Sequence, residues 1–102
     1  MSSIKIRTKL LNGVTLVRTL ITHPMETGRS KDNTGKEIPP HFIQELIVKH
    51  NDRIIAQTFM ASGISKNPFF AYKFKGGQSG DKITVSWVDN LGQSDSQERL
   101  LQ

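Results

Sequence analysis

Apolar and polar residues alternate along most of the chain, and turn-forming residues interrupt this alternation at short intervals. In residues 4–10, Ile4, Ile6 and Leu10 share one face of an extended segment, while basic residues occupy the other face. A period of two is typical of a β-strand with one buried face. Six further strands are predicted from the same pattern and the turn residues between them, over residues 14–22, 42–50, 53–59, 69–75, 82–88 and 94–101.

The predicted strands are short, and no segment shows the period of an amphipathic helix. This pattern favours an all-β fold, an immunoglobulin-like antiparallel β-sandwich of about seven strands. A small barrel is the alternative. With 102 residues the chain is long enough for one core, so we expect a single domain over residues 1–102. The glycine-rich stretch 76–80 is interpreted as a hairpin turn, because it lacks the ending of a phosphate-binding loop.

The second and third predicted strands are apolar on both faces. The outer face of a strand in an isolated sandwich meets water, so part of this apolar surface needs another cover. Four side chains are surplus in this sense: Val17, Ile21, Ile43 and Ile47. A β-bulge or register change could turn them inward. The other interpretation makes them the interface with a partner subunit, because exposed apolar patches on small domains usually have a partner.

Two polar segments between the strands are unusual in composition. The first, residues 23–40 (HPMETGRSKDNTGKEIPP), is far longer than the usual connection of about four to six residues. The second, residues 65–70, reads SKNPFF. Loops held by a rigid scaffold often carry recognition, and both segments contain proline. We therefore predict one recognition surface at an end of the sandwich, formed by His23, Met25, Glu26, Arg29, Lys31, Lys66, Asn67 and Phe69.

The chain carries a net charge of +5 and has a pI near 9.8, so its surface attracts anions. Basic decoration of solvent-facing strands is the favoured explanation of this charge. Proteins that bind single-stranded nucleic acid on a sheet combine basic and aromatic residues on one open face. The aromatic residues here alternate with polar ones and are predicted to face the core, and they are Phe70, Tyr72, Phe74 and Trp87. We therefore expect no nucleic-acid partner.

The residue types also limit the chemistry. Without cysteine the chain has no disulfide, no thiolate zinc cluster and no thiol nucleophile. His23, Met25 and Glu26, with His41 or His50, offer ligands that would suit copper, but their spacing matches no closed site. No nucleophile elbow or paired-carboxylate motif occurs. We predict a protein that is not an enzyme and has no catalytic residue, no metal and no cofactor.

The termini and the apolar runs bear on localisation. Residues 1–11 alternate basic and apolar residues and lack the apolar core of a signal peptide. The apolar runs are too short to cross a bilayer. Taken alone, the chain is therefore expected to be a soluble protein without its own export signal and without a membrane partner.

Several motifs in the two unusual loops and in one late strand resemble a known family. The first motifs are residues 23–28 (HPMETG), 31–32 (KD), 35–36 (GK) and 38–39 (IP). The others are Ser65, Asn67, Pro68, Phe69 and Phe70 in the second loop, with Trp87 and Asp89. Together, and in this order, they resemble SoxZ, the family of small subunits of the SoxYZ carrier in bacterial thiosulfate oxidation. The resemblance spans nearly the whole chain.

The resemblance implies an immunoglobulin-like sandwich that forms a heterodimer with SoxY. In that pair, sulfur intermediates are bound covalently to a cysteine near the end of a flexible, glycine-rich C-terminal arm of SoxY, and other pathway enzymes act on them there. A SoxZ-like subunit supplies no thiol and is not catalytic. The implied localisation is periplasmic, through export in folded form with the partner's twin-arginine signal. A basic surface would attract the anionic cargo and the acidic faces of docking enzymes.

Two alternative functions stay open on the sequence alone. One is a generic immunoglobulin-like adaptor with a different partner. The other is a basic β-domain that binds anions or nucleic acid.

Overall fold

A computed structural model of the protein describes residues 3–29, 31–60 and 64–102. Within these residues the chain forms seven strands: β1 (Ile4–Leu11), β2 (Val14–Ile21), β3 (Ile43–His50), β4 (Arg53–Phe59), β5 (Phe69–Lys75), β6 (Lys82–Asp89) and β7 (Ser94–Leu100). The strands predicted from the sequence are confirmed, and each boundary lies within one residue of its predicted place. No helix that could cross a membrane occurs in the described part of the chain.

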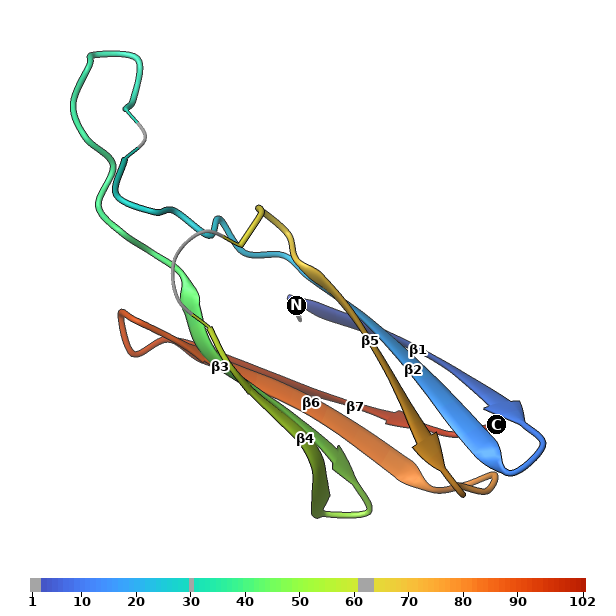
Figure 1. Ribbon diagram of the computed structural model, residues 1–102. Helices are drawn as coiled ribbons and strands as arrows, with labels where there is room; N and C mark the ends of the chain where they lie inside the picture. The colour runs from blue at the N-terminus through green and yellow to red at the C-terminus, as the bar shows by residue number, and fades with distance from the viewer. Residues whose placement is uncertain (1–2, 30, 61–63) are drawn as a thin grey trace.

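The strands form two antiparallel sheets, one with the order β1-β2-β5 and one with the order β4-β3-β6-β7. Figure 1 shows the two sheets packed as a sandwich with long strands. The predicted immunoglobulin-like β-sandwich is thereby confirmed. One detail differs, because β5 pairs with β2 and β6 pairs with β3. Residues 76–80 therefore cross from one sheet to the other, and the predicted hairpin turn at this place is wrong.

The core lies between the sheets and follows the predicted alternation in most strands. β1 buries Ile4 and Ile6, and β6 buries Ile83, Val85 and Trp87. The aromatic side chains of β5 also face the core, where they are half-buried: Phe70, Tyr72 and Phe74. Burial of this apolar surface stabilises the sandwich, at roughly 1.5–3 kcal/mol for each large side chain taken fully out of water.

β2 turns toward the core the face that contains Val17 and Ile21, the two residues predicted to be surplus. Val17 and Ile21 are fully buried, whereas Leu20 on the opposite face is 42% exposed. The other inward positions of β2 hold Thr15 and Thr19, which are also fully buried. Thr15 donates a hydrogen bond from Oγ1 to the Gly76 carbonyl at 2.7 Å, which satisfies its hydroxyl inside the sandwich. The prediction that Val17 and Ile21 contact a partner subunit is therefore wrong.

β3 contains the irregularity that the sequence left open. Its register against β6 shifts between Ile43 and Glu45, and this β-bulge lets both Ile43 and Leu46 face the core. Ile43 is fully buried, so its predicted place in a subunit interface is also wrong. Ile47 is half-buried on the outer face of the sheet. Of the four residues predicted for the interface, Ile47 alone lies at the surface.

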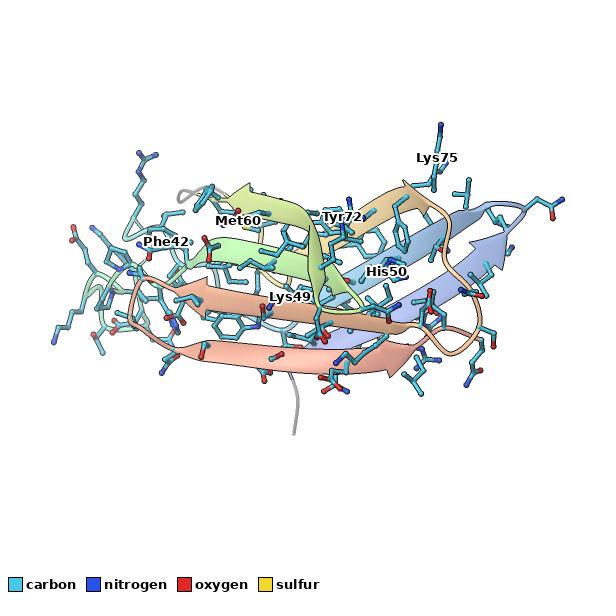
Figure 2. All side chains as sticks on the ribbon, turned by 90° about the horizontal axis from the view of Figure 1, so that it is seen from below. Phe42, Lys49, His50, Met60, Tyr72 and Lys75 are labelled. Carbon is cyan, nitrogen blue, oxygen red and sulfur yellow. The ribbon has the colours of Figure 1, made fainter. Side chains whose placement is uncertain are left out.

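The two sides of the sandwich differ. On one side Ser3, just before β1, donates hydrogen bonds from N and from Oγ to Asp95 Oδ2 of β7, at 2.8 and 2.7 Å. Trp87 Nε1 donates to Ser3 Oγ at 3.1 Å. On the other side, a contact of 3.5 Å between the hydroxyls of Thr58 and Tyr72 joins β4 to β5. In Figure 2, Lys75 at the end of β5 projects away from the body of the sandwich.

Candidate functional site

The segment between β2 and β3 is a protruding loop, residues 23–40, which extends beyond the sandwich in Figure 1. Isolated bridges pair Glu26 with His41 and Lys31 with Glu37, so the two limbs of the loop run side by side. The backbone N–H groups of Glu26 and His41 donate to each other's carbonyl oxygens at 2.6 and 2.9 Å. This pairing defines the path of the described part of the loop.

Gly28 allows the two limbs of the protruding loop to approach closely. A Cβ atom at residue 28 would lie 2.8 Å from Cγ of Pro40, which is too short for two carbon atoms. The backbone of Gly28 also has a φ of 89°, where residues with a side chain are strained. Both the conformation and the contact therefore require glycine here.

The tip of the protruding loop is a tight turn around Asp32. Its carboxylate accepts hydrogen bonds from the hydroxyl and the N–H of Thr34 and from the N–H of Lys36, at 2.6, 2.9 and 3.1 Å. These bonds favour the ionised form and lower the pKa of Asp32. The surrounding side chains are exposed, among them Arg29 and Lys31. The tip therefore presents cations from an ordered turn.

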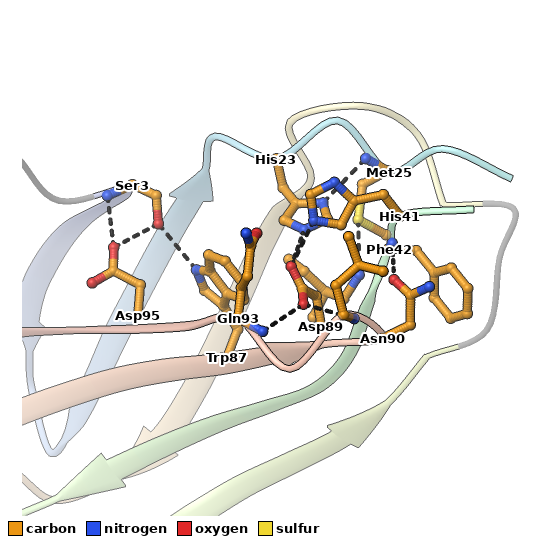
Figure 3. A network of polar contacts seen from close by, with 12 residues as sticks. Ser3, His23, Met25, His41, Phe42, Trp87, Asp89, Asn90, Gln93 and Asp95 are labelled. Carbon is orange, nitrogen blue, oxygen red and sulfur yellow. Dashed lines mark hydrogen bonds and ion pairs between the residues drawn. The ribbon is translucent and has the colours of Figure 1, made fainter. Parts of the chain in front are cut away.

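At the base of the protruding loop, a buried carboxylate binds two histidines (Figure 3). Asp89 Oδ2, at the end of β6, accepts hydrogen bonds from Nε2 of His23 at 3.2 Å and of His41 at 2.7 Å. Its Oδ1 accepts from the N–H groups of Leu91 and Gln93 at 3.0 and 2.9 Å. The side chains of His23 and Asp89 are 2% and 0% exposed, and that of His41 is 24% exposed. We call these three residues the His–Asp–His cluster.

The environment of Asp89 decides its ionisation. Burial favours the neutral acid and by itself would raise the pKa. The hydrogen bonds from His23, His41, Gln93 and Leu91 favour the carboxylate, and together they outweigh burial. The pKa of Asp89 is therefore lowered, and the residue is a carboxylate at neutral pH. Below that pKa the carboxyl group is protonated and accepts these hydrogen bonds less well.

The same three residues are candidates for a metal site, because their ligand atoms lie within 4.8 Å of one another. The hydrogen bonds of His23 argue against this role. Its Nδ1 accepts the N–H of Met25 at 3.1 Å, so the proton of the neutral ring is on Nε2, which donates to Asp89. A histidine that binds a metal through one ring nitrogen generally donates a hydrogen bond through the other. The geometry therefore fits a hydrogen-bonded brace better than a metal centre.

The His–Asp–His cluster also holds the second unusual loop. The N–H of His23 donates to Asn67 Oδ1, and the N–H of Asn67 donates to the His23 carbonyl, both at 3.0 Å. Asn67 has a φ of 52°, a left-handed conformation that asparagine tolerates better than most residues. The N–H of Ile21 donates to the Pro68 carbonyl at 3.0 Å. Residues 64–68 and the protruding loop thus meet at one end of the sandwich.

The residues predicted for recognition separate into two groups. The side chains on the surface are Arg29, Lys31, Lys66, Asn67 and Phe69. Glu26 is half-buried, while His23 and Met25 are 3% and 5% exposed. Burial excludes direct contact between a partner and these last two side chains, so their predicted place in the recognition surface is wrong. They position the loop, since the N–H of Ile43 donates to Met25 Sδ at 3.4 Å.

His50 and Asp89 differ from the sequence-based expectation for a metal site. His50, considered with His23 for a metal site, lies elsewhere and donates through Nε2 to Asp81 Oδ2 at 2.7 Å. Asp89 carries no local signal of a site, because it is the last residue of a regular strand and precedes an ordinary turn. Only its place in the resemblance to SoxZ marks it in the sequence.

The outer faces of the two sheets have different chemistry. On the three-stranded sheet, all the outward cations are exposed, and we call them the basic face: Lys5, Arg7, Lys9, Arg18, Lys73 and Lys75. On the four-stranded sheet, Phe59 and Val88 lie on either side of Glu45 in the register. Phe59 is 73% exposed, the highest value among the exposed large hydrophobic residues of the described chain.

Further apolar side chains continue the surface around Phe59. In the next row Ile47 lies between Gln57 and Ser86, and in the row after that Ile54 pairs with Lys49. We call the apolar members of these rows the apolar patch: Ile47, Ile54, Phe59 and Val88. Ile54, Phe59 and Val88 could not be assigned to this patch from the sequence, because their place in it depends on the register between strands.

Comparisons with known proteins agree with the fold and with the motifs. The family described as "Sulphur oxidation protein SoxZ" matches residues 4–99. Among solved structures, the chain is similar to superoxide reductase (neelaredoxin) from Archaeoglobus fulgidus in the reduced form, with a TM-score of 0.63 and 19% sequence identity. That alignment covers 97% of this chain and 86% of the neelaredoxin chain, and at this identity it shows the fold alone. No curated protein sequence matches the chain significantly.

The family match includes both unusual loops, all of the His–Asp–His cluster and six strands in full. The resemblance of the motifs to SoxZ is thereby confirmed. The chain belongs to the SoxZ family and so to the Sox system of sulfur oxidation.

Proposed function

We propose that the chain is the non-catalytic subunit of a SoxYZ-type carrier, paired with a SoxY protein whose arm cysteine carries the sulfur intermediates. The observation that carries this proposal is a SoxZ family match over residues 4–99 in a chain without cysteine. Covalent binding of sulfur as a persulfide or thiosulfonate needs a thiol, and this chain has none. The thiol must therefore come from another polypeptide.

The apolar patch is the proposed contact with SoxY. Phe59, Ile54 and Val88 are between 42% and 73% exposed in the chain alone, and Ile47 joins them. Exposed apolar side chains grouped on one sheet face usually mark a protein interface. Gln57, Ser86, Ser94 and Ser96 are uncharged neighbours in these rows, and their removal from water costs less than that of a charged group. Glu45 and Lys49 are the charged members of the rows, and Glu45 accepts a hydrogen bond from Gln57. A hollow of about 430 Å³ beside Phe59 and Val88 could receive a side chain of the partner.

The loop end of the sandwich is the proposed surface for the enzymes that act on the carried sulfur. Arg29 and Lys31 are exposed on the protruding loop, and Lys66 and Phe69 are exposed beside it. Binding to an ordered loop costs less conformational entropy than binding to a mobile one. The paired limbs and the His–Asp–His cluster therefore support this role. The proposed localisation is the periplasm, reached together with the partner.

Co-expression with the SoxY protein of the same genome tests the pairing. A tag on the partner should retain this chain at equal stoichiometry through purification. The heterodimer should persist in high salt, because an apolar interface is not weakened by screening. Recovery of the partner without this chain, at any salt concentration, contradicts the proposal.

A further inference from the structure

The basic face contains no acidic side chain of its own, and Glu98 of β7 lies beside it, where it lines a hollow together with Lys5 and Arg7. The strands β1, β2 and β5 contain its six cations and not one Asp or Glu. The nine carboxylates of the chain all lie elsewhere, at Glu26, Asp32, Glu37, Glu45, Asp52, Asp81, Asp89, Asp95 and Glu98. None of the ion pairs found among the described residues includes a cation of the basic face. The six positive charges of the basic face thus exceed the net charge of +5, and they all lie on one side of the sandwich.

The register of the sheet makes this arrangement unfavourable for the chain by itself. Arg7 and Arg18 lie directly opposite each other on β1 and β2. Like charges in directly opposed positions destabilise an antiparallel pair, and a carboxylate at either position would stabilise it. The positive potential above this pair attracts anions and increases the rate of encounter with an acidic partner. The pair is therefore better explained by binding than by stability.

Apolar side chains lie among the cations. Leu20 pairs with Lys5 on one side and with Phe69 on the other, and Phe69 is 60% exposed. A hollow of about 380 Å³ is lined by Lys5, Arg7, Arg18, Leu20 and Phe69. A neighbouring hollow of about 210 Å³ lies along Arg7, Arg18 and Leu16. The surface therefore offers guanidinium groups and an apolar contact at the same place.

We propose that the basic face docks an acidic protein surface, with carboxylates against Arg7 and Arg18 and an apolar side chain over Leu20 and Phe69. Arginine binds carboxylates with two parallel hydrogen bonds, which suits side chains of Asp and Glu. Single-stranded nucleic acid would need aromatic platforms on this face. Phe70, Tyr72 and Phe74 point to the core instead, and Phe69 is the only aromatic residue on the outer side of these strands. An acidic protein is thus the favoured partner.

This inference goes beyond the proposed function, because it holds whatever protein covers the apolar patch.

The test is a titration of the full chain, labelled with ¹⁵N, against a short glutamate-rich peptide that contains one phenylalanine. We expect salt-sensitive binding, with shifted amide resonances confined to β1, β2 and β5. Replacement of both arginines (Arg7→Gln with Arg18→Gln) should weaken binding by about tenfold or more, since close charge pairs dominate such contacts.

A matched control separates the basic face from net charge. Lys36→Gln with Arg53→Gln removes the same charge from exposed positions outside the face and should change the affinity by less than about twofold, as rim charges do. The spectrum of each variant reports whether it is folded. Equal weakening by both pairs overturns the proposal, as does a lack of peptide binding at low salt. Tighter binding of oligothymidylate, or equal binding of free thiosulfate at the same charge concentration, overturns it in favour of nucleic acid or a small anion.

Discussion

At the scale of single residues, Asp89 does most to define the loop end. One carboxylate accepts hydrogen bonds from two imidazoles at the base of the protruding loop, those of His23 and His41, and from two N–H groups of the turn after β6. His23, one of these donors, also exchanges backbone and side-chain bonds with Asn67. Three segments that are distant in sequence are therefore fixed by one ionised group. Removal of a partner from such a buried network leaves the others unsatisfied, which is costly.

The variant Asp89→Asn tests this role. An amide cannot accept four hydrogen bonds on two oxygens, so we expect a loss of unfolding free energy of about 1–3 kcal/mol at neutral pH. Because the folded pKa of Asp89 is lowered, its ionisation stabilises the fold above the ordinary aspartate pKa of about 3.9. That contribution disappears as the pH falls through the folded pKa. The difference in unfolding free energy between Asp89→Asn and the wild type should therefore become smaller there. Urea unfolding at several pH values measures this difference.

The control for this experiment is Asp52→Asn. Asp52 forms an exposed ion pair with Lys82 at 3.2 Å, and such pairs contribute about 0–1 kcal/mol. Both variants change the net charge equally. A loss in Asp89→Asn no larger than that in Asp52→Asn, or one that does not depend on pH, would show that the cluster does not brace the loops.

At the scale of strands, the sequence was enough to locate every element but not to orient all of them. A period of two and strong turn residues determined the strand boundaries. The inward face of β2 was predicted wrongly because Thr15 and Thr19 occupy inward positions. Threonine has the shape of valine and packs in a sheet interior. The hydroxyl of Thr15 donates to an acceptor there, whereas Thr19 Oγ1 is buried without a hydrogen-bond partner among the described residues. Hydropathy alone therefore does not show which face of β2 is buried.

The outer faces depend on information that one strand does not contain. The bulge in β3 moves Ile43 and Leu46 to the same side and leaves Ile47 outside. The apolar patch then forms only through the register of β3 with β4 and β6. The His–Asp–His cluster is similar, because His23, His41 and Asp89 are distant in the sequence and their approach follows from the sandwich topology. Pattern analysis therefore identified the unusual loops but not their anchor.

The apolar patch leads to a prediction for the partner interface. Ile47→Asp with Phe59→Asp places two charges at its centre and should weaken binding to SoxY by at least about tenfold, since buried apolar anchors dominate interfaces. Leu11→Asp with Leu91→Asp is the matched control, because both leucines are exposed outside the patch, at 47% and 58%. Surface-binding measurements with the purified partner give the dissociation constants. Equal affinities of the two double variants for SoxY would show that the interface does not lie at the apolar patch.

At the scale of the whole molecule, the sandwich separates three surfaces. The four-stranded sheet presents the apolar patch, the three-stranded sheet presents the basic face, and one end presents the braced loops. None of these surfaces offers a thiol. The separation suits a subunit that is attached to a carrier on one side and meets pathway enzymes on others. In this account, its contribution is to position the partner's cargo.

Intact-mass analysis of both subunits tests this account most directly. The purified pair is incubated with thiosulfate and the pathway enzymes, and SoxY is treated identically without this chain. We predict added sulfur mass on the SoxY cysteine alone, and a marked loss of that loading when this chain is left out. Sulfur bound covalently to this chain, or equal loading of SoxY in its absence, would contradict the account.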